Sequence, residues 1–222
     1  MPFKSFCFLI SLSFLSSLCG ESDPFSKPFD DPVDDAGLPR VLIIGDSISI
    51  GYTPRIRTLL KGKANVHRPK TNCRWSAYGN ENILQWIGDK KWDLIHFNFG
   101  LWDWYGWKQE NKSTPESDAN SLEGIVNKLR PSGAKLVFAM TTPPCIGPEK
   151  KVKFMVSDEQ AEAFNRAALA VMKKHGVAIN DLYSAMGKVR AEYQLGIDDV
   201  QYNDSGRVLL AAQVSKVIIK EL

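Results

Sequence analysis

The stretch RVLIIGDSISIGY, residues 40–52, predicts a strand, a glycine turn and the start of a helix. RVLIIG is a short β-branched run that ends in Gly45, and the residues from Ser49 to Leu60 form an amphipathic stretch. Strand-like and helix-like segments then alternate along the rest of the chain, which is the pattern of a parallel sheet with helices on both faces. We therefore expect an α/β protein of the three-layer α/β/α sandwich type, with a mostly parallel sheet of five strands.

The remaining elements follow from the same alternation. WDLIHFNFG, residues 92–100, is apolar on both faces, which places it inside the sheet. The other strands are expected in ANVHRP (64–69), AKLVFAMTTPP (134–144) and VAIND (177–181). Helices are expected in ENILQWIGDK (81–90), from Asn120 to Leu129, in SDEQAEAFNRAALAVMKKHG (157–176) and from Ser205 to Leu222.

The N-terminal segment differs in composition from the rest of the chain. Residues 1–20 place Lys4 before an apolar run that is too short to span a bilayer, which predicts a secretory signal peptide and an exported protein, periplasmic or extracellular. A lipoprotein acylated at Cys19 is the alternative, although the bulky Leu18 argues against it. Residues 21–39 are rich in Pro and Asp and are interpreted as a tether or disordered leader before one domain, residues 40–222.

Charge and cysteine content exclude several functions. The formal net charge is only +3 and no basic run stands out, so neither nucleic acid nor an anionic membrane surface is expected as a partner. With three His and no CxxC or HExxH motif, no metal site and no cofactor are expected. After removal of a signal peptide only Cys73 and Cys145 remain, either paired in an oxidising compartment or as two separate buried thiols.

Ligands of open α/β sheets bind outside the carboxyl ends of the strands. Four segments fall there: Gly45-Asp46-Ser47, Gly100–Asp103, Thr141–Cys145 and the loop before the last helix. Ser47 follows the strand-to-helix turn, where its hydroxyl lies near the positive end of a helix. Taken alone, Gly-Asp-Ser is equally typical of a helix cap, and Asp46 is interpreted as fixing the turn.

Three short blocks follow one another along the chain. They are Gly-Asp-Ser after the first strand, GLWD (100–103) after the third and DDVQYNDSG (198–206) before the last helix. In this order the sequence resembles the SGNH or GDSL family of serine hydrolases, above all its small exported bacterial members, from Arg40 to Leu222. The resemblance implies Ser47 as nucleophile, with its backbone amide and that of Gly79 binding the oxyanion; Asn72 is the weaker match for the position of Gly79. It aligns Trp102 with an oxyanion-binding Asn.

The last block of the family is Asp-x-x-His, in which His is the general base and Asp orients it. Here it reads Asp198-Asp199-Val200-Gln201, so Gln201 occupies the position of the base. A neutral amide cannot accept the serine proton near pH 7, and loss of the base from a triad costs on the order of a millionfold in turnover. Asp198 is the expected orienting acid, and Asp199 remains the alternative.

The chain has three histidines that could be considered as a replacement for the missing base. His96 precedes Gly100 by four strand residues, so at ~3.3 Å per residue it lies about 13 Å below the catalytic edge and is expected in the core. His175 belongs to a helix C-terminus, where the dipole favours a cation. His67 is nearer the useful end of its strand and is the one candidate for reaching Ser47.

The loop FGLWDWYGWKQ, residues 99–109, concentrates Trp102, Trp104, Tyr105 and Trp107 beyond the third strand. Such rings either stack on a sugar or acyl group or plug the loop onto the body, and Trp104, Tyr105 and Trp107 are the candidate substrate-binding residues. Two functions follow. One is an esterase for small-molecule or carbohydrate esters, impaired by Gln201. The other is a non-catalytic protein that binds a saccharide or lipid in the same cleft.

Overall fold

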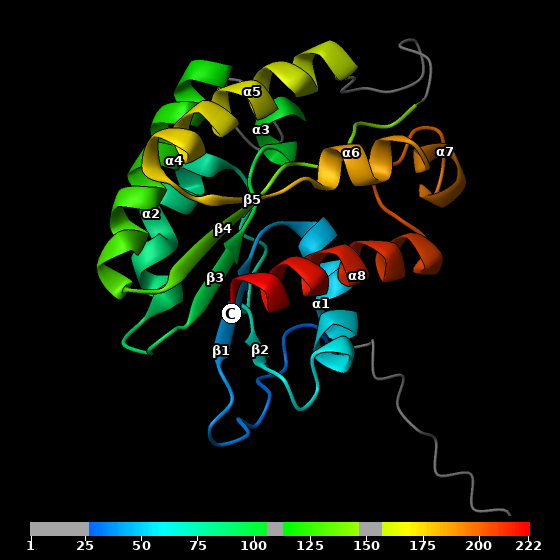
Figure 1. The fold of residues 1–222 in the computed structure, drawn as a ribbon. Helices are drawn as coiled ribbons and strands as arrows, with labels where there is room; N and C mark the ends of the chain where they lie inside the picture. Colours follow the sequence, from blue (N-terminus) through cyan, green and yellow to red (C-terminus); the bar gives the residue numbers. More distant parts are fainter. Residues whose placement is uncertain (1–26, 106–112, 147–156) are drawn as a thin grey trace, which may run out of the picture.

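The computed structural model describes residues 27–105, 113–146 and 157–222. They form a five-stranded, fully parallel sheet in the order β2-β1-β3-β4-β5 (Figure 1). The strands are β1 (Arg40–Ile44), β2 (Asn65–His67), β3 (Leu94–Phe97), β4 (Lys135–Ala139) and β5 (Ala178–Asn180). Each lies within a segment expected from the sequence, which confirms the α/β/α sandwich.

Helices cover both faces of the sheet. One layer contains α1 (Ser47–Leu59) and α8 (Asp204–Glu221), and the other contains α2 (Ser76–Ile87), α4 (Pro115–Leu129) and α5 (Asp158–His175). Four short elements had no sequence prediction: α3 (Leu101–Tyr105), the 3-10 turn η1 (Arg130–Ser132), α6 (Leu182–Gly187) and α7 (Arg190–Tyr193). No helix in the three described ranges is long and apolar enough to cross a membrane.

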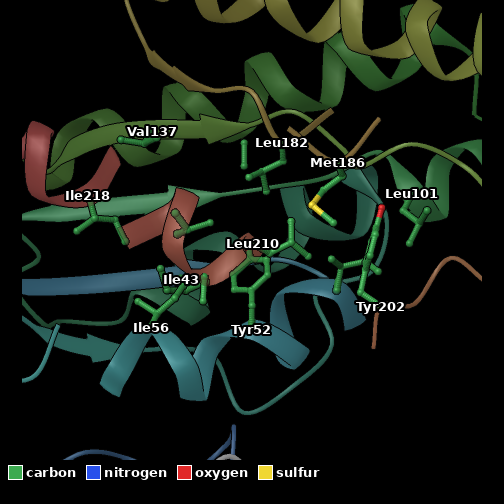
Figure 2. Close-up of a cluster of buried hydrophobic side chains, with 14 of the residues drawn as sticks. Ile43, Tyr52, Ile56, Leu101, Val137, Leu182, Met186, Tyr202, Leu210 and Ile218 are labelled. Atoms are coloured by element: carbon green, nitrogen blue, oxygen red, sulfur yellow. The ribbon is translucent and has the colours of Figure 1, made fainter. Parts of the chain in front are cut away.

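The strand residues alternate between two apolar cores, because successive side chains of a strand point to opposite faces of a sheet. In β1, Val41 and Ile43 pack with Tyr52 of α1 and Leu210 of α8, part of the cluster drawn in Figure 2. Leu42 and Ile44 belong to the opposite core, which includes Ile83 of α2, Ile125 of α4 and Met172 of α5. Burial on both sides explains why these strands are continuous apolar runs.

Helix limits follow local capping. Ser157 and Gln160 form a capping box at the start of α5, and Gly176 at φ 64° ends it, as the sequence predicts. Helix α4 begins earlier than expected, at Pro115, because Thr114 and Ser117 form a second capping box there. The helix is therefore one turn longer than its apolar pattern indicates.

The leader is not a free tether where the structure describes it. Asp34 forms an ion pair with Arg40 Nε at 2.8 Å and contacts His67 Nε2 at 2.6 Å, while the Asn65 amide donates to the backbone of Asp35 at 3.0 Å. Residues 27–39 thus pack along edge strand β2, which corrects the expectation of a disordered leader for this part. The predicted signal peptide, residues 1–20, and Cys19 lie outside the described residues.

Candidate active site

The turn between β1 and α1 is held by side chains buried beneath it. Asp46 is the N-cap of α1 and accepts a hydrogen bond from Ile48 N at 2.9 Å, while Ser49 Oγ donates to the Asp46 carbonyl at 2.7 Å. Burial raises the pKa of Asp46 to about 6. Asp46 therefore fixes the turn, as the sequence indicates, and half-buried Ser47 is the first residue of α1.

Arg68 supports the same turn from below and was not singled out from the sequence. Its side chain is buried, and its guanidinium donates to Thr53 Oγ1 at 3.1 Å and to Ser49 Oγ and the Gly45 carbonyl at 3.3 Å each. Its charge also lowers the pKa of Asp46, partly offsetting the effect of burial. The sequence signal was a cation directly after a buried strand, at the end that faces the site.

Gln201 contacts Ser47 directly. Its Nε2 donates to Ser47 Oγ at 2.8 Å. The preceding loop is closed by an antiparallel bridge between Gln194 and Tyr202 and by a 2.9 Å hydrogen bond from Leu195 N to the Gln201 carbonyl. The structure thus brings the first and last sequence blocks together and places an amide against the serine.

The two acidic residues before Gln201 differ in their surroundings. Asp199 Oδ1 accepts from the Gln201 backbone N–H at 2.8 Å. Asp198 is exposed, and within the described residues its side chain has no hydrogen-bond partner. Neither carboxylate is bonded to the Gln201 side chain among these residues, so an orienting acid is not assembled around the amide.

A cavity of about 280 Å³ opens beside Ser47. Its wall comes from the first turns of α1, the start of α8 and the leader, so residues far apart in the sequence meet around the serine. The lining residues are Pro28, Ser47, Ile50, Gly51, Arg55, Gln201, Asp204 and Arg207. A somewhat larger cavity of about 340 Å³ lies at the β2 edge around His67 and Trp92, away from the serine.

A family model described as "GDSL-like Lipase/Acylhydrolase family" matches residues 43–207, which include Ser47 and Gln201. The chain belongs to the GDSL-like lipase/acylhydrolase family. The match begins within β1 and ends in α8, so it includes all or part of every strand and most of the residues that line the cavity. No curated protein is similar enough in sequence to count as a match.

Several solved structures share this fold at low sequence identity. An acetyl xylan esterase, AlAXEase, is 16% identical with a TM-score of 0.66, over 81% of this chain and 99% of that chain. A lipase/acylhydrolase from Enterococcus faecalis is 20% identical with a TM-score of 0.67, over 83% and 97%. A GDSL-like lipase from Bacteroides thetaiotaomicron is 14% identical with a TM-score of 0.69, over 87% and 93%.

All three histidines of this GDSL-family chain are engaged away from Ser47. His96 is buried, its Nε2 lies 3.1 Å from Asn180 Nδ2, and burial lowers its pKa to about 4, so it is the expected core residue. His175 contacts Glu123 at 3.0 Å at the end of α5. His67 contacts Asp34 at 2.6 Å and pairs in register with Leu42, well before the carboxyl end of β1. None of them replaces Gln201 as a base.

The expected oxyanion contribution of Gly79 is wrong. Gly79 lies inside α2, and its amide donates to the Trp75 carbonyl at 2.9 Å, as helix geometry requires. Its lack of a side chain serves packing, because a Cβ there would come within 2.4 Å of the Phe99 ring. Trp102, the other oxyanion candidate, is half-buried on α3 with its ring 6.1 Å from that of Trp75.

The aromatic loop plugs the body instead of lining the cavity. Trp104 is 4% exposed and Tyr105 2% exposed, both in the core that contains α1 and α8, so the prediction that they bind substrate is wrong. Tyr105 Oη lies 3.6 Å from Cys145 Sγ. Trp107 lies outside the described residues. The rings therefore anchor α3, which is the alternative that the sequence left open.

The loop after the third strand is fixed by a close backbone approach at Gly100 and by hydrogen bonds to Asp103. Gly100 adopts φ 133° and approaches Thr141 so closely that a Cβ would lie 2.4 Å from Oγ1. Buried Asp103 accepts from Ser76 Oγ at 2.8 Å and from Ser113 Oγ at 3.2 Å, which joins α3 to the start of α2. Burial raises the pKa of Asp103.

Both cysteines of the described chain are free and buried. Burial raises the pKa of Cys73 to about 12, which keeps it a neutral thiol. The structure thus has the two separate thiols, not the disulfide that export would allow.

Proposed function

We propose that this protein is an exported ester hydrolase scaffold for acyl or acetyl esters of carbohydrates, with Ser47 as nucleophile and with turnover impaired by Gln201. The observation that carries the proposal is the 2.8 Å contact from Gln201 Nε2 to Ser47 Oγ beside an open cavity. Family membership supplies the ester chemistry, and the likeness to an acetyl xylan esterase motivates the carbohydrate substrate.

Gln201 changes the direction of the hydrogen bond at the nucleophile. In acyl transfer the base takes the hydroxyl proton of serine as Oγ bonds to the ester carbonyl carbon, and later returns it to the leaving alcohol. Gln201 donates to Oγ and has no titratable lone pair for that proton. The Ser47 amide at the start of α1 would still stabilise an oxyanion, which leaves a small residual rate.

A second candidate is a non-catalytic protein that binds a saccharide or lipid in the same cavity. It is favoured by the three histidines, each of which is committed to another partner. In this case the scaffold would retain ligand recognition without acyl transfer.

A fluorophosphonate probe separates the two candidates. The hydrolase proposal expects slow covalent labelling of the native protein at Ser47, lost in Ser47→Ala and detected by intact-mass spectrometry. Ser132→Ala, on the 3-10 turn η1, is a matched serine control and should label like the native protein. If an acetylated oligosaccharide binds while Ser47 stays unlabelled over hours, the binding-protein candidate replaces the proposal.

A further inference from the structure

Two arginines line the cavity beside Ser47. Neither belongs to the three sequence blocks that carry the family resemblance. Arg55 lies on α1 and Arg207 on α8, and both line the same cavity as Ser47 and Gln201. Arg55 is buried, and its guanidinium donates to Asp204 Oδ1 at 2.9 Å and to the Gly51 carbonyl at 3.2 Å. Arg55 is therefore a fixed part of the wall.

Gly51 makes room for Arg207. A Cβ at position 51 would lie 3.2 Å from Arg207 Nε and 3.5 Å from its Cδ, so the arginine stem crosses α1 at the point where a side chain is missing. Arg207 lines the cavity where it passes Gly51, which lies one helical turn from Ser47 on α1. A larger residue at position 51 would displace it.

The cavity wall carries more positive than negative charge. Among the described residues that line it, the titratable side chains are Arg55, Arg207 and Asp204, which leaves one excess positive charge. Asp204 is 82% exposed and lies 3.6 Å from Arg207 Nη1, while its 2.9 Å contact is with Arg55. Exposed ion pairs are weak, so the pair with Asp204 leaves Arg207 able to bind an anion.

We propose that this cavity recognises a carboxylate on the saccharide part of the ligand, and that the substrate class is an acyl ester of an acidic, uronate-containing saccharide. The inference rests on the proposed function and adds the charge of the substrate. Arginine presents a planar pair of donors that matches a carboxylate, and Arg207 would bind it while the ester group lies at Ser47 in the same cavity. Arg207 is the specificity-determining residue.

Binding calorimetry on the native protein tests the inference with two probes of similar size. One is an acetylated oligogalacturonate and the other is a neutral acetylated xylo-oligosaccharide. We expect the acidic probe to bind about tenfold or more tightly at low salt, and its affinity to fall as the ionic strength rises because a partly exposed ion pair is screened. Arg207→Gln should reduce its affinity to that of the neutral probe.

Two variants keep the test decisive if Arg207→Gln is poorly folded. Gly51→Leu retains both charges but fills the space that the Arg207 stem crosses, and Arg207→Lys retains the charge without the planar fork, so both should lower the ratio of the affinities for the acidic and the neutral probe. Arg166→Gln, an exposed arginine of α5 paired with Glu162, is the matched control and should change neither affinity.

The outcomes separate the two levels of the proposal. Equal affinity of the native protein for both probes, or an acidic preference that survives in Arg207→Gln, overturns the carboxylate assignment and leaves the ester-hydrolase scaffold intact. Absence of binding by either probe, together with absence of labelling at Ser47, overturns the proposed function itself.

Discussion

The two loops that meet at Ser47 differ in how firmly side-chain contacts fix them. The turn before α1 is held by a buried N-cap, by Ser49 and by a buried arginine, so the position of Ser47 is determined by several contacts. The loop before α8 is held mainly by its backbone, through the bridge between Gln194 and Tyr202, and its Asp198 points into solvent.

This difference indicates which half of a hydrolytic site the chain retains. Placing a nucleophile requires a rigid turn, and that turn is complete. Moving a proton requires a titratable side chain with an orienting acid, and the second loop supplies a neutral amide.

Gln201→His should produce the largest change. An imidazole in the place of the amide can accept the Ser47 proton, so we expect turnover of a short aryl ester to rise by on the order of 10³-fold or more. Steady-state kinetics of the native protein and the variant measure the gain. The double variant that adds Ser47→Ala should lose it.

A native protein that already turns over the ester well, and loses this in Ser47→Ala, would contradict the assignment. Another group would then be acting as base, and His67→Gln would be the next variant to measure. The structure argues against that result because His67 is in contact with Asp34.

Arg68→Leu should have the next largest effect, on the turn. The substitution removes the donors to Gly45, Ser49 and Thr53 and leaves the buried Asp46 without its neighbouring cation. Leaving buried acceptors without their charged donor costs about 1–3 kcal/mol of unfolding free energy for each group. Urea denaturation measures the loss. Arg166→Leu, at an exposed position, should change stability by less than about 0.5 kcal/mol, and an equal loss in both variants would refute the role of Arg68.

The sequence predicted the fold well because its strands are short apolar runs that end at glycine or proline, as β1 does, and because helices such as α5 carry clear caps at both ends. It also brought Ser47 and Gln201 together, since parallel strands share one carboxyl edge. It could not show that Gly79 lies within a helix, or that Trp104 and Tyr105 face inward, because an aromatic residue in a loop carries no periodic signal for its direction. Arg68 was missed because its partners lie on α1 and the turn before it, and Arg207 because the cavity that it lines forms only where α8 packs against α1.

The pH dependence of stability reports on Asp46. Burial raises its pKa from the ordinary 3.8 to about 6, so its contribution to stability is full below about pH 4 and is lost as the pH rises through about 6. That difference corresponds to on the order of 3 kcal/mol. Asp46→Asn retains a cap without the charge, so relative to the native protein it should gain stability between pH 4 and pH 8, as measured by urea denaturation at each pH.

Asp158→Asn is the control of opposite sign. Its hydrogen bonds from Arg190 lower the pKa of Asp158, so the native protein should gain stability relative to this variant as the pH rises above the acidic range. If Asp46→Asn showed no trend, or a trend in the direction of Asp158→Asn, the cap would not be the buried, neutralisable group described here.

Asp198→Asn should have the smallest effect and probes the loop again. The side chain is exposed and has no hydrogen-bond partner within the described residues, so stability should change by less than about 0.5 kcal/mol. Asp199→Asn should cost little as well, because the amide oxygen of Asn can still accept from the Gln201 backbone N–H, as Asp199 does at 2.8 Å. The same two substitutions, made in the Gln201→His variant, identify the orienting acid. Turnover of that variant should fall only when the carboxylate that contacts the new imidazole is replaced. A loss confined to Asp198→Asn would mean that this loop still carries the acid of a triad whose base is missing.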